Sequence, residues 1–270
     1  MKKNCVKLIT ILLTISIIMS LTGCSSKKST DSFTKIKERG YVTVGLDDTF
    51  APMGFKDSTG NIVGFDVDLA KEVFKRIGLQ VKFQSIDWSM KETELSSGNI
   101  DMIWNGYTIT PERQEKVSFT KPYLANRQII ITLADSKINS KADLKGKKVS
   151  TQSGSSSLDA INKDSEFAAS LSGGEPILFD NYNEAFMDME AKRSDALVAD
   201  EILVRYYLKE RGAEKYKILS DNFGTEEYGV GLRKTDTKLL SKINEALDGM
   251  KKDGTSSKIS VKWFGEDIVK

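Results

Sequence analysis

The chain has 270 residues, with 40 lysines and arginines against 38 aspartates and glutamates, two cysteines and no histidine. The absence of histidine excludes Ser-His-Asp and Cys-His catalysis and most zinc sites, so a general base would have to be a carboxylate or a lysine. The nearly even charge argues against a nucleic-acid-binding surface.

Residues 1–23 have the features of a secretory signal. Three lysines precede an apolar stretch of 12 residues, Leu8 to Met19, whereas a membrane-spanning helix needs ~20 residues. The next residues, "LTGC", resemble the lipobox of bacterial lipoproteins, in which cleavage before the cysteine frees it for acylation. We therefore expect the signal to be removed and Cys24 to carry lipid, including palmitate. A buried helix or a membrane anchor is the alternative for this segment.

Removal of the signal leaves 247 residues, enough for two ordinary domains. It also takes away three basic residues, leaving 37 against 38 acidic ones, so the mature chain is nearly neutral. Because Cys5 leaves with the signal and Cys24 carries lipid, we expect no disulfide in the folded part. Residues 25–31, "SSKKSTD", lack apolar side chains, and residues 24–32 are therefore expected to form a lipidated N-terminus and flexible tether.

Strand-like and helix-like segments alternate along the rest of the chain, which is typical of an α/β protein with largely parallel sheets. β-Branched and apolar runs predict strands at residues 41–46, 81–86, 99–104, 127–134, 147–152, 175–180 and 195–200. Amphipathic runs predict helices at residues 66–77, 91–98, 157–163, 183–193 and 238–254, and residues 226–232 are expected to be extended. In the first helix, Asp66 is expected to be the N-terminal cap and Gly78 to end the helix.

The order of these segments predicts two lobes. The first series of elements and the C-terminal helix form one lobe, residues 33–124 and 226–270, and residues 125–225 form an inserted second lobe. The chain then crosses between the lobes twice, near residues 123–127 and near residues 223–228. Two crossing strands favour a hinge over a single flexible linker.

Polar and aromatic residues follow the predicted strands, at the place where open α/β sheets bind their ligands. They are Asp47, Phe50, Trp88, Asn105, Gly106, Thr108, Gln152, Ser153, Ser155, Ser156 and Asp200. Any one of them, taken singly, is more often a turn, a helix cap or a core residue. Their coincidence at five strand ends predicts a ligand cleft between the two lobes.

This set of side chains suits a zwitterion. Arg113 can hold a carboxylate with two parallel hydrogen bonds, and the helix that starts near Ser155 adds main-chain N–H groups to the same carboxylate. Asp200 is placed to pair an ammonium group. Phe50 and Trp88 are expected to enclose the side chain of the ligand and to stack on a cationic end.

The sequence resembles the bacterial extracellular solute-binding proteins of family 3, which include the glutamine- and lysine/arginine/ornithine-binding proteins of ABC importers. The matching segments are "GFDVDLA", "ITPER", "DLKGKKVSTQSGSSS", "RSDALVAD" and "DGTSSKISVKWFG", and the likeness spans nearly all of residues 34–265. The resemblance implies a two-lobed periplasmic-binding-protein-like fold of type II, with a ligand cleft between lobes joined by two hinge strands.

The resemblance also implies roles for the residues at the strand ends. Arg113 would hold the α-carboxylate with Thr108 and the backbone near Ser156, and Asp200 would bind the α-ammonium. The carbonyl at Asn105 or Gly106 would assist Asp200. Among the residues facing the side chain of the ligand would be Asp47, Phe50 and Trp88, with Gln152 and Ser153 closing from the other lobe.

The side chain of the ligand is expected to be basic, arginine first, because Asp47, with Asp48 or Glu226, makes the site acidic. Asn105 departs from the small residue usual in these relatives, and glutamine and cystine remain alternatives. By resemblance, we expect a monomer that needs no cofactor or metal. The lipid would hold it at the outer face of the cell membrane beside the permease and ATPase subunits of an ABC importer.

A dehydratase and a sensory ectodomain are two alternatives to a binding protein. Some relatives with this fold are dehydratases acting on cyclic acids, and such an enzyme would need a buried carboxyl of raised pKa, for which Asp47 and Asp200 are the candidates. A sensory ectodomain would need a later transmembrane segment, and no apolar stretch from residue 24 onward is long enough. We therefore expect a binding protein and not an enzyme.

Overall fold

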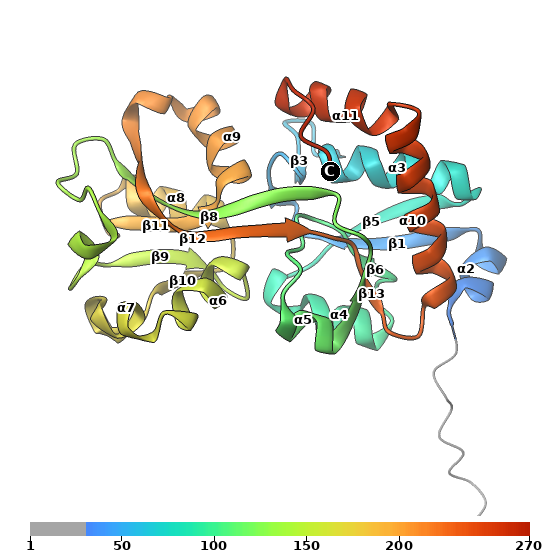
Figure 1. Cartoon of the computed structure of the whole chain (residues 1–270), viewed down its shortest axis with the longest axis horizontal. Coiled ribbons are helices and arrows are strands. Elements are labelled where there is room, and N and C mark those ends of the chain that lie inside the picture. Colours follow the sequence, from blue (N-terminus) through green and yellow to red (C-terminus); the bar gives the residue numbers. More distant parts are fainter. Residues whose placement is uncertain (1–30) are drawn as a thin grey trace, which may run out of the picture. The chain divides into compact units, whose positions relative to one another are not determined.

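The computed structural model describes residues 31–270, and Ser32–Lys270 form one compact unit (Figure 1). The predicted signal and Cys24 lie outside the described residues. Among residues 31–270, no helix has the length and apolar character that crossing a bilayer requires.

The first five-stranded sheet has the order β5-β1-β6-β13-β7. Its strands are β1 (Tyr41–Leu46), β5 (Gln80–Ser85), β6 (Met102–Ile103), β7 (Val117–Phe119) and β13 (Gly231–Arg233). β1 is parallel to β5 and β6, whereas β13 is antiparallel to β6 and β7. Val42, Val44 and Leu46 of β1, which point to one face of the sheet, are fully buried, whereas Tyr41 and Thr43 on the other face are partly exposed.

The second five-stranded sheet has the order β10-β9-β11-β8-β12. Its strands are β8 (Leu124–Leu133), β9 (Val149–Gln152), β10 (Ile177–Phe179), β11 (Ala196–Asp200) and β12 (Tyr216–Tyr228). A small third sheet joins β2 (Thr49–Phe50), β3 (Gly54–Lys56) and β4 (Ile62–Val63). The two larger sheets are the two lobes, and the predicted two-lobed α/β fold is confirmed.

The strands β8 and β12 run side by side from the second sheet toward the first (Figure 1). Their antiparallel register pairs Glu226 with Asn126 and Tyr228 with Leu124, and the pairing shifts between Ile218 and Asn222. The two predicted crossings are therefore one paired ribbon, which favours a bending motion over free rotation of the lobes. The predicted residue boundaries of the lobes stay a prediction.

The helices surround these sheets. They are α2 (Phe33–Arg39), α3 (Phe65–Ile77), α4 (Lys91–Ser97), α5 (Pro111–Lys116), α6 (Ser156–Lys163), α7 (Ser165–Ser170), α8 (Tyr182–Glu190), α9 (Glu201–Arg211), α10 (Thr237–Lys252) and α11 (Thr255–Phe264). The spacing of Leu239, Ile243, Ala246 and Met250, all buried, puts one apolar stripe of α10 on the core. The sequence reading missed α9, which follows Asp200 directly.

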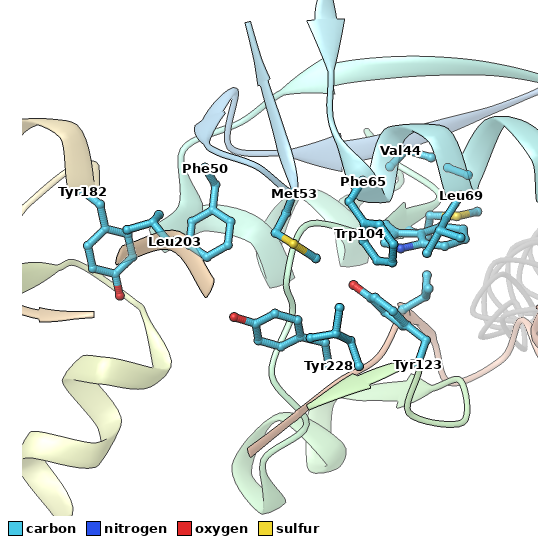
Figure 2. Close-up of a cluster of buried hydrophobic side chains, with 14 of the residues drawn as sticks. Val44, Phe50, Met53, Phe65, Leu69, Trp104, Tyr123, Tyr182, Leu203 and Tyr228 are labelled. Carbon is cyan, nitrogen blue, oxygen red and sulfur yellow. The ribbon is translucent and has the colours of Figure 1, made fainter. Parts of the chain in front are cut away.

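One hydrophobic cluster continues through both lobes, and Figure 2 shows Phe50 of the first lobe facing Tyr182 and Leu203 of the second. The rings of Phe50 and Tyr182 are 5.9 Å apart, centroid to centroid. Apolar contact between the lobes therefore stabilises the arrangement in which they meet.

The expectation that Asp66 caps α3 was wrong. Gly64 is the residue before the helix, with φ 144°, and Asp66 lies inside the first turn with 1% of its surface exposed. Its carboxylate accepts hydrogen bonds from the main-chain N–H of Gly106 (2.7 Å) and the hydroxyl of Tyr123 (2.9 Å). Because the helix starts one residue earlier than predicted, Asp66 turns inward and holds the loop that follows β6.

The buried position of Asp66 predicts a pH dependence of stability. Burial raises the pKa of Asp66 from 3.8 to about 7. Between these values the folded protein keeps a proton that the unfolded chain releases, so this contribution favours folding at low pH and is lost as the pH rises toward 7. We expect the free energy of unfolding to fall between about pH 4 and 7, with on the order of 4 kcal/mol of the fall due to Asp66.

Urea unfolding of the wild type and Asp66→Asn across this pH range measures that contribution. The asparagine variant cannot release the proton, and its curve should lack that part of the fall. If the free energies of unfolding of the two proteins changed with pH in parallel, the fall could not be assigned to Asp66.

Candidate functional site

The ends of β1, β6, β9 and β11 meet the hinge strands at the boundary between the lobes, and the lobes touch there directly. Nε2 of Gln152 donates to the carboxylate of Asp47 (2.7 Å), and the hydroxyls of Thr108 and Ser156 are 3.0 Å apart. These contacts join residues that the sequence predicts to face each other across the cleft. The facing edges of the lobes are therefore in a closed arrangement.

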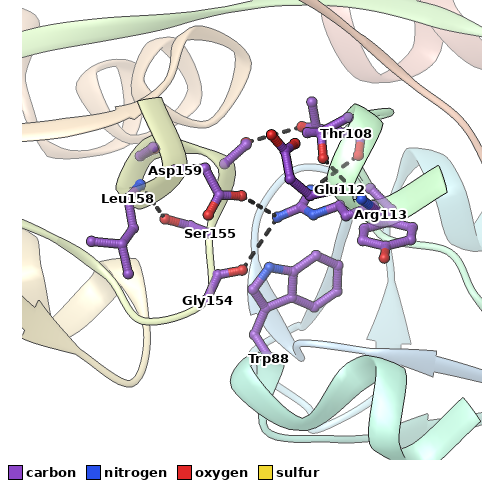
Figure 3. Close-up of polar contacts among 12 residues, drawn as sticks. Trp88, Thr108, Glu112, Arg113, Gly154, Ser155, Leu158 and Asp159 are labelled. Carbon is purple, nitrogen blue, oxygen red and sulfur yellow. Dashed lines mark hydrogen bonds and ion pairs between the residues drawn. The ribbon is translucent and has the colours of Figure 1, made fainter. Parts of the chain in front are cut away.

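Arg113 lies on α5, which Thr110 caps by accepting a hydrogen bond from the main-chain N–H of Arg113 (3.2 Å). Only 5% of Arg113 is exposed. Its guanidinium donates to the carbonyl of Thr108 (3.0 Å) in its own lobe and to the carbonyl of Gly154 (3.2 Å) in the other lobe (Figure 3). Asp159 lies 3.6 Å from the same guanidinium. Arg113 thus reaches across the boundary to the loop before α6.

Helix α6 starts beside this guanidinium. Ser155 is its N-terminal cap and accepts a hydrogen bond from the main-chain N–H of Leu158 (3.1 Å). The N–H groups of Ser156 and Ser157 belong to the first turn, where helical amides have no acceptor within the helix. The helix N-terminus and Arg113 therefore lie side by side, and both offer positive charge at this place.

Lys91 is a second cation at this place, and the sequence reading missed it. Its side chain is 3% exposed, and Nζ donates to the carbonyls of Gly154 (2.8 Å) and Trp88 (3.1 Å). Burial, together with the charge of Arg113, lowers the pKa of Lys91 to about 8. Two cations from the first lobe therefore converge on one carbonyl of the second. In the sequence, Lys91 looks like an ordinary first residue of a helix.

Asp200 ends β11 and is 3% exposed. One carboxylate oxygen accepts hydrogen bonds from Tyr228 (2.5 Å) and from the amide of Asn126 (2.7 Å), and the other from Tyr182 (3.4 Å). Burial, and then the charge of Glu226, raises the pKa of Asp200 well above its usual value. Asp200 is thus the centre of a buried polar cluster on the hinge.

Glu226 of β12 belongs to the same cluster. Its carboxylate accepts hydrogen bonds from the amides of Asn126 (2.6 Å) and Gln128 (2.7 Å) and from the hydroxyl of Thr108 (2.9 Å). Asn126 and Gln128 were not predicted as site residues. Their polar side chains on an otherwise apolar strand were the signal that could have revealed them.

Asp47 follows β1 and is largely buried. Its carboxylate accepts hydrogen bonds from Thr49 and Gln152, and burial raises its pKa. The side-chain carbonyl of Asn105 accepts from the main-chain N–H of Asp47 (3.0 Å), which brings these two predicted residues together. Asp48, by contrast, pairs with Lys56 (2.5 Å), so its charge is already balanced.

The remaining predicted residues lie around this core. Gly106 has φ 58°, and a Cβ atom there would stand 2.7 Å from the ring of Phe50, so the loop requires glycine. Trp88 packs edge-on against Tyr107, in a different apolar cluster from Phe50. Ser153 is half-buried, and its main-chain N–H bonds to the carbonyl of Phe179 (2.8 Å). Enclosure of a ligand side chain by Phe50 and Trp88 stays a prediction.

A separate pocket of about 490 Å³ lies between α9 and α11, beside the hinge strands. Its polar wall is the ion pair of Glu201 with Arg127 (2.6 Å), and its apolar wall includes Trp263 and Phe264. None of the predicted site residues lines it. Asn126, which bonds to Asp200 and Glu226, does line it, so the pocket adjoins the hinge cluster.

Known proteins resemble the chain over both lobes. The family model described as bacterial extracellular solute-binding proteins, family 3, matches residues 42–266. The L-cystine-binding protein TcyA of Bacillus subtilis (strain 168) is 33% identical over 245 residues, which cover 90% of this chain and 88% of TcyA.

Solved structures of amino-acid-binding proteins also resemble the chain. An ABC uptake transporter substrate-binding protein from Streptococcus pneumoniae with bound histidine is 40% identical, with a TM-score of 0.87, over 90% of this chain and 99% of that one. An ancestral arginine-binding protein bound to glutamine is 44% identical, with a TM-score of 0.78, over 84% of this chain and 99% of that one.

Proposed function

The chain belongs to the bacterial extracellular solute-binding proteins of family 3 and is a substrate-binding protein of an amino-acid ABC transporter; we propose that it captures a polar, basic amino acid, arginine first, by closing its two lobes. The site residues of this proposal are Asp47, Phe50, Trp88, Asn105, Gly106, Thr108, Arg113, Gln152, Ser153, Ser155, Ser156 and Asp200.

The observation that carries the proposal is the separation of charge along the lobe boundary. Arg113 and the start of α6 form a cationic side, and Asp200 with the hinge cluster forms an anionic side. Thr108 and Ser156 connect the two through the carboxylate of Glu226. A free amino acid carries a carboxylate and an ammonium on one carbon, which matches opposite charges this close together.

Closure explains capture and delivery. Each lobe alone carries only part of the charge pattern, so a ligand that contacts both stabilises the closed arrangement over the open one. The closed form would be the one that docks on the permease and its ATPase. Relatives bind cystine, histidine and glutamine, so these three amino acids are needed as controls for specificity.

The preference for a basic side chain rests on Asp47. Its carboxylate is buried and bonds to neutral groups, Thr49 and Gln152. A guanidinium would supply the missing positive charge, whereas the glutamine side chain supplies only a neutral amide. Cystine, the other alternative ligand, ends in a second ammonium and a second carboxylate and supplies no net charge. A buried carboxylate left without a charged partner costs about 1–3 kcal/mol or more, enough to discriminate between these ligands.

Replacement of Asp47 by asparagine tests this preference. We expect Asp47→Asn to weaken arginine binding by about tenfold or more and to change glutamine binding far less. Titration calorimetry of both ligands on both proteins gives the comparison, with Asp48→Asn as the neighbouring control. Equal losses for the two ligands would remove the basic preference.

The experiment that tests the proposed function is a thermal-shift screen of the mature chain against the twenty amino acids, ornithine and cystine. A ligand that binds only the folded state raises the melting temperature, and the rise grows with the logarithm of the ligand concentration relative to Kd. A rise with arginine, lysine or ornithine supports the proposal in full. A rise with cystine, glutamine or histidine alone overturns the side-chain preference, and no rise with any amino acid overturns the function.

The lipid anchor at Cys24 is part of the proposal, and with it a location at the outer face of the cell membrane as a monomer. A single acyl chain holds a protein only weakly, so we expect more than one chain. Mass spectrometry of the N-terminal peptide of the membrane-extracted protein tests the anchor. An unmodified Cys24, or a peptide that still contains residues 1–23, would contradict it.

One observation favours a second candidate function, a dehydratase. The raised pKa values of Asp200 and Asp47 are what a general acid needs. The amino-acid transporter relatives and the polar partners of both carboxylates weigh against it. Incubation with cyclic hydroxy acids and detection of their dehydrated products separates the two functions.

A further inference from the structure

A buried carboxylate, Asp200, and a partly buried one, Glu226, share one hydrogen-bond donor at the hinge. The amide Nδ2 of Asn126 lies 2.7 Å from an oxygen of Asp200 and 2.6 Å from an oxygen of Glu226. The two acids reach this point from different strands, β11 and β12, with Asn126 on β8 between them. Their negative charges are therefore placed side by side by the sheet itself.

Neutral groups alone satisfy this pair among the described residues. Tyr182 from α8 and Tyr228 from β12 donate to Asp200, and Thr108 and Gln128 donate to Glu226. No lysine or arginine of residues 31–270 forms an ion pair with either carboxylate. Arg113 is the nearest cation in the bonded network, and it donates to the main-chain carbonyl of Thr108.

Two adjacent carboxylates, one buried and one partly buried, cannot both stay ionised at low cost without a cation. Either one of them keeps a proton, or a cation enters between them. The raised pKa of Asp200, caused by burial and then by Glu226, agrees with the first alternative for the protein without ligand. The shared amide of Asn126 places the two acids close enough for one proton to be held between them.

We propose that Glu226 is the second acid of the ammonium subsite, so that Asp200 and Glu226 bind the α-ammonium of the ligand together and release their shared proton when it arrives. This inference rests on the proposed function. It adds a binding residue, Glu226, and a coupling between ligand binding and proton release. The α-ammonium is common to all amino acids, so the subsite does not depend on which side chain is selected. Because β12 is a hinge strand, the same contact couples ligand binding to the position of the lobes.

Proton release is the direct test. Titration calorimetry with L-arginine, and in parallel with L-histidine, L-glutamine and L-cystine, is run at neutral pH in buffers of different ionisation enthalpy. The wild type should release a proton on binding, and its affinity should rise with pH until the pair is ionised. Glu226→Gln should release none and should bind roughly ten- to hundredfold more weakly, because a charge-assisted hydrogen bond is lost. Unchanged proton release in Glu226→Gln would overturn the proposal.

A ligand that lacks the α-ammonium separates this role from a structural one. With 5-guanidinopentanoate, the deaminated counterpart of arginine, Glu226→Gln and the wild type should bind alike. An equal loss for arginine and its counterpart would mean that Glu226 only supports Thr108 and Ser156, and the proposal would fail. Glu226→Asp, which keeps the charge, should retain proton release, and this variant serves if Glu226→Gln does not fold.

The neighbouring Glu227 provides the matched control. It lies on the same strand, is partly exposed and pairs with Lys270, so Glu227→Gln should behave as the wild type. If the wild type binds no amino acid, the proposed function fails. If the wild type binds and Glu226→Gln matches it in affinity and proton release, only the role of Glu226 fails.

Discussion

Arg113→Ala is expected to eliminate measurable amino-acid binding, a loss of about three orders of magnitude or more. The guanidinium is buried, held by the ring of Tyr107 at 4.8 Å and by the carbonyl of Thr108, so its position is fixed before a ligand arrives. It faces the start of α6, and both would act on one carboxylate. Removal of the arginine therefore takes away the charge and the two-pronged geometry at once.

Arg113→Lys separates these two contributions. Lysine keeps the charge but offers no planar fork, so we expect its binding to be intermediate between the wild type and Arg113→Ala. Arg193→Ala is the matched control. Arg193 forms an ion pair with Asp188 (2.6 Å), and its side chain is largely exposed. Calorimetric titration with the amino acid selected by the screen measures all four proteins, and circular dichroism reports their folding. Tight binding by a folded Arg113→Ala would refute the site.

The fold could be predicted because its signals are local. β-Branched runs such as "YVTVGL" and the apolar stripe of α10 identify their elements without knowledge of the partners. The strand ends also follow a general rule, since parallel strands bring their carboxyl ends to one edge. Asp47 and Gln152 were predicted in this way, and the structure brings their side chains together.

The rest of the site depends on which elements meet, and spacing alone does not contain that information. Lys91 is the first residue of a short helix in the sequence, and only the approach of the Gly154 loop makes it a buried cation between lobes. Asp66 reads as a helix cap, but the loop of Gly106 makes it an inward-facing acceptor. Asn126 becomes a bridge only because β11 and β12 flank β8.

Gly154→Ala is expected to block closure and thereby to weaken amino-acid binding by about tenfold or more. Gly154 has φ 67°, and a Cβ atom on it would stand 2.9 Å from the main-chain Cα of Ser89 in the other lobe. A backbone atom cannot move aside cheaply, so the lobes would have to stay further apart. The hydrogen bonds that Lys91 and Arg113 make to the carbonyl of Gly154 would then be lost together.

Gly146→Ala is the control that isolates this effect. Gly146 lies in the same lobe with φ 71°, but nothing lies within 4 Å of its Cβ position. Both variants carry the backbone penalty of about 1–2 kcal/mol for a left-handed residue, and only Gly154→Ala carries the clash between lobes. Small-angle X-ray scattering with and without the amino acid should show compaction in the wild type and Gly146→Ala, and none in Gly154→Ala. Full compaction and wild-type affinity in Gly154→Ala would mean that closure does not bring Ser89 and Gly154 together, and that ligand binding does not require this contact.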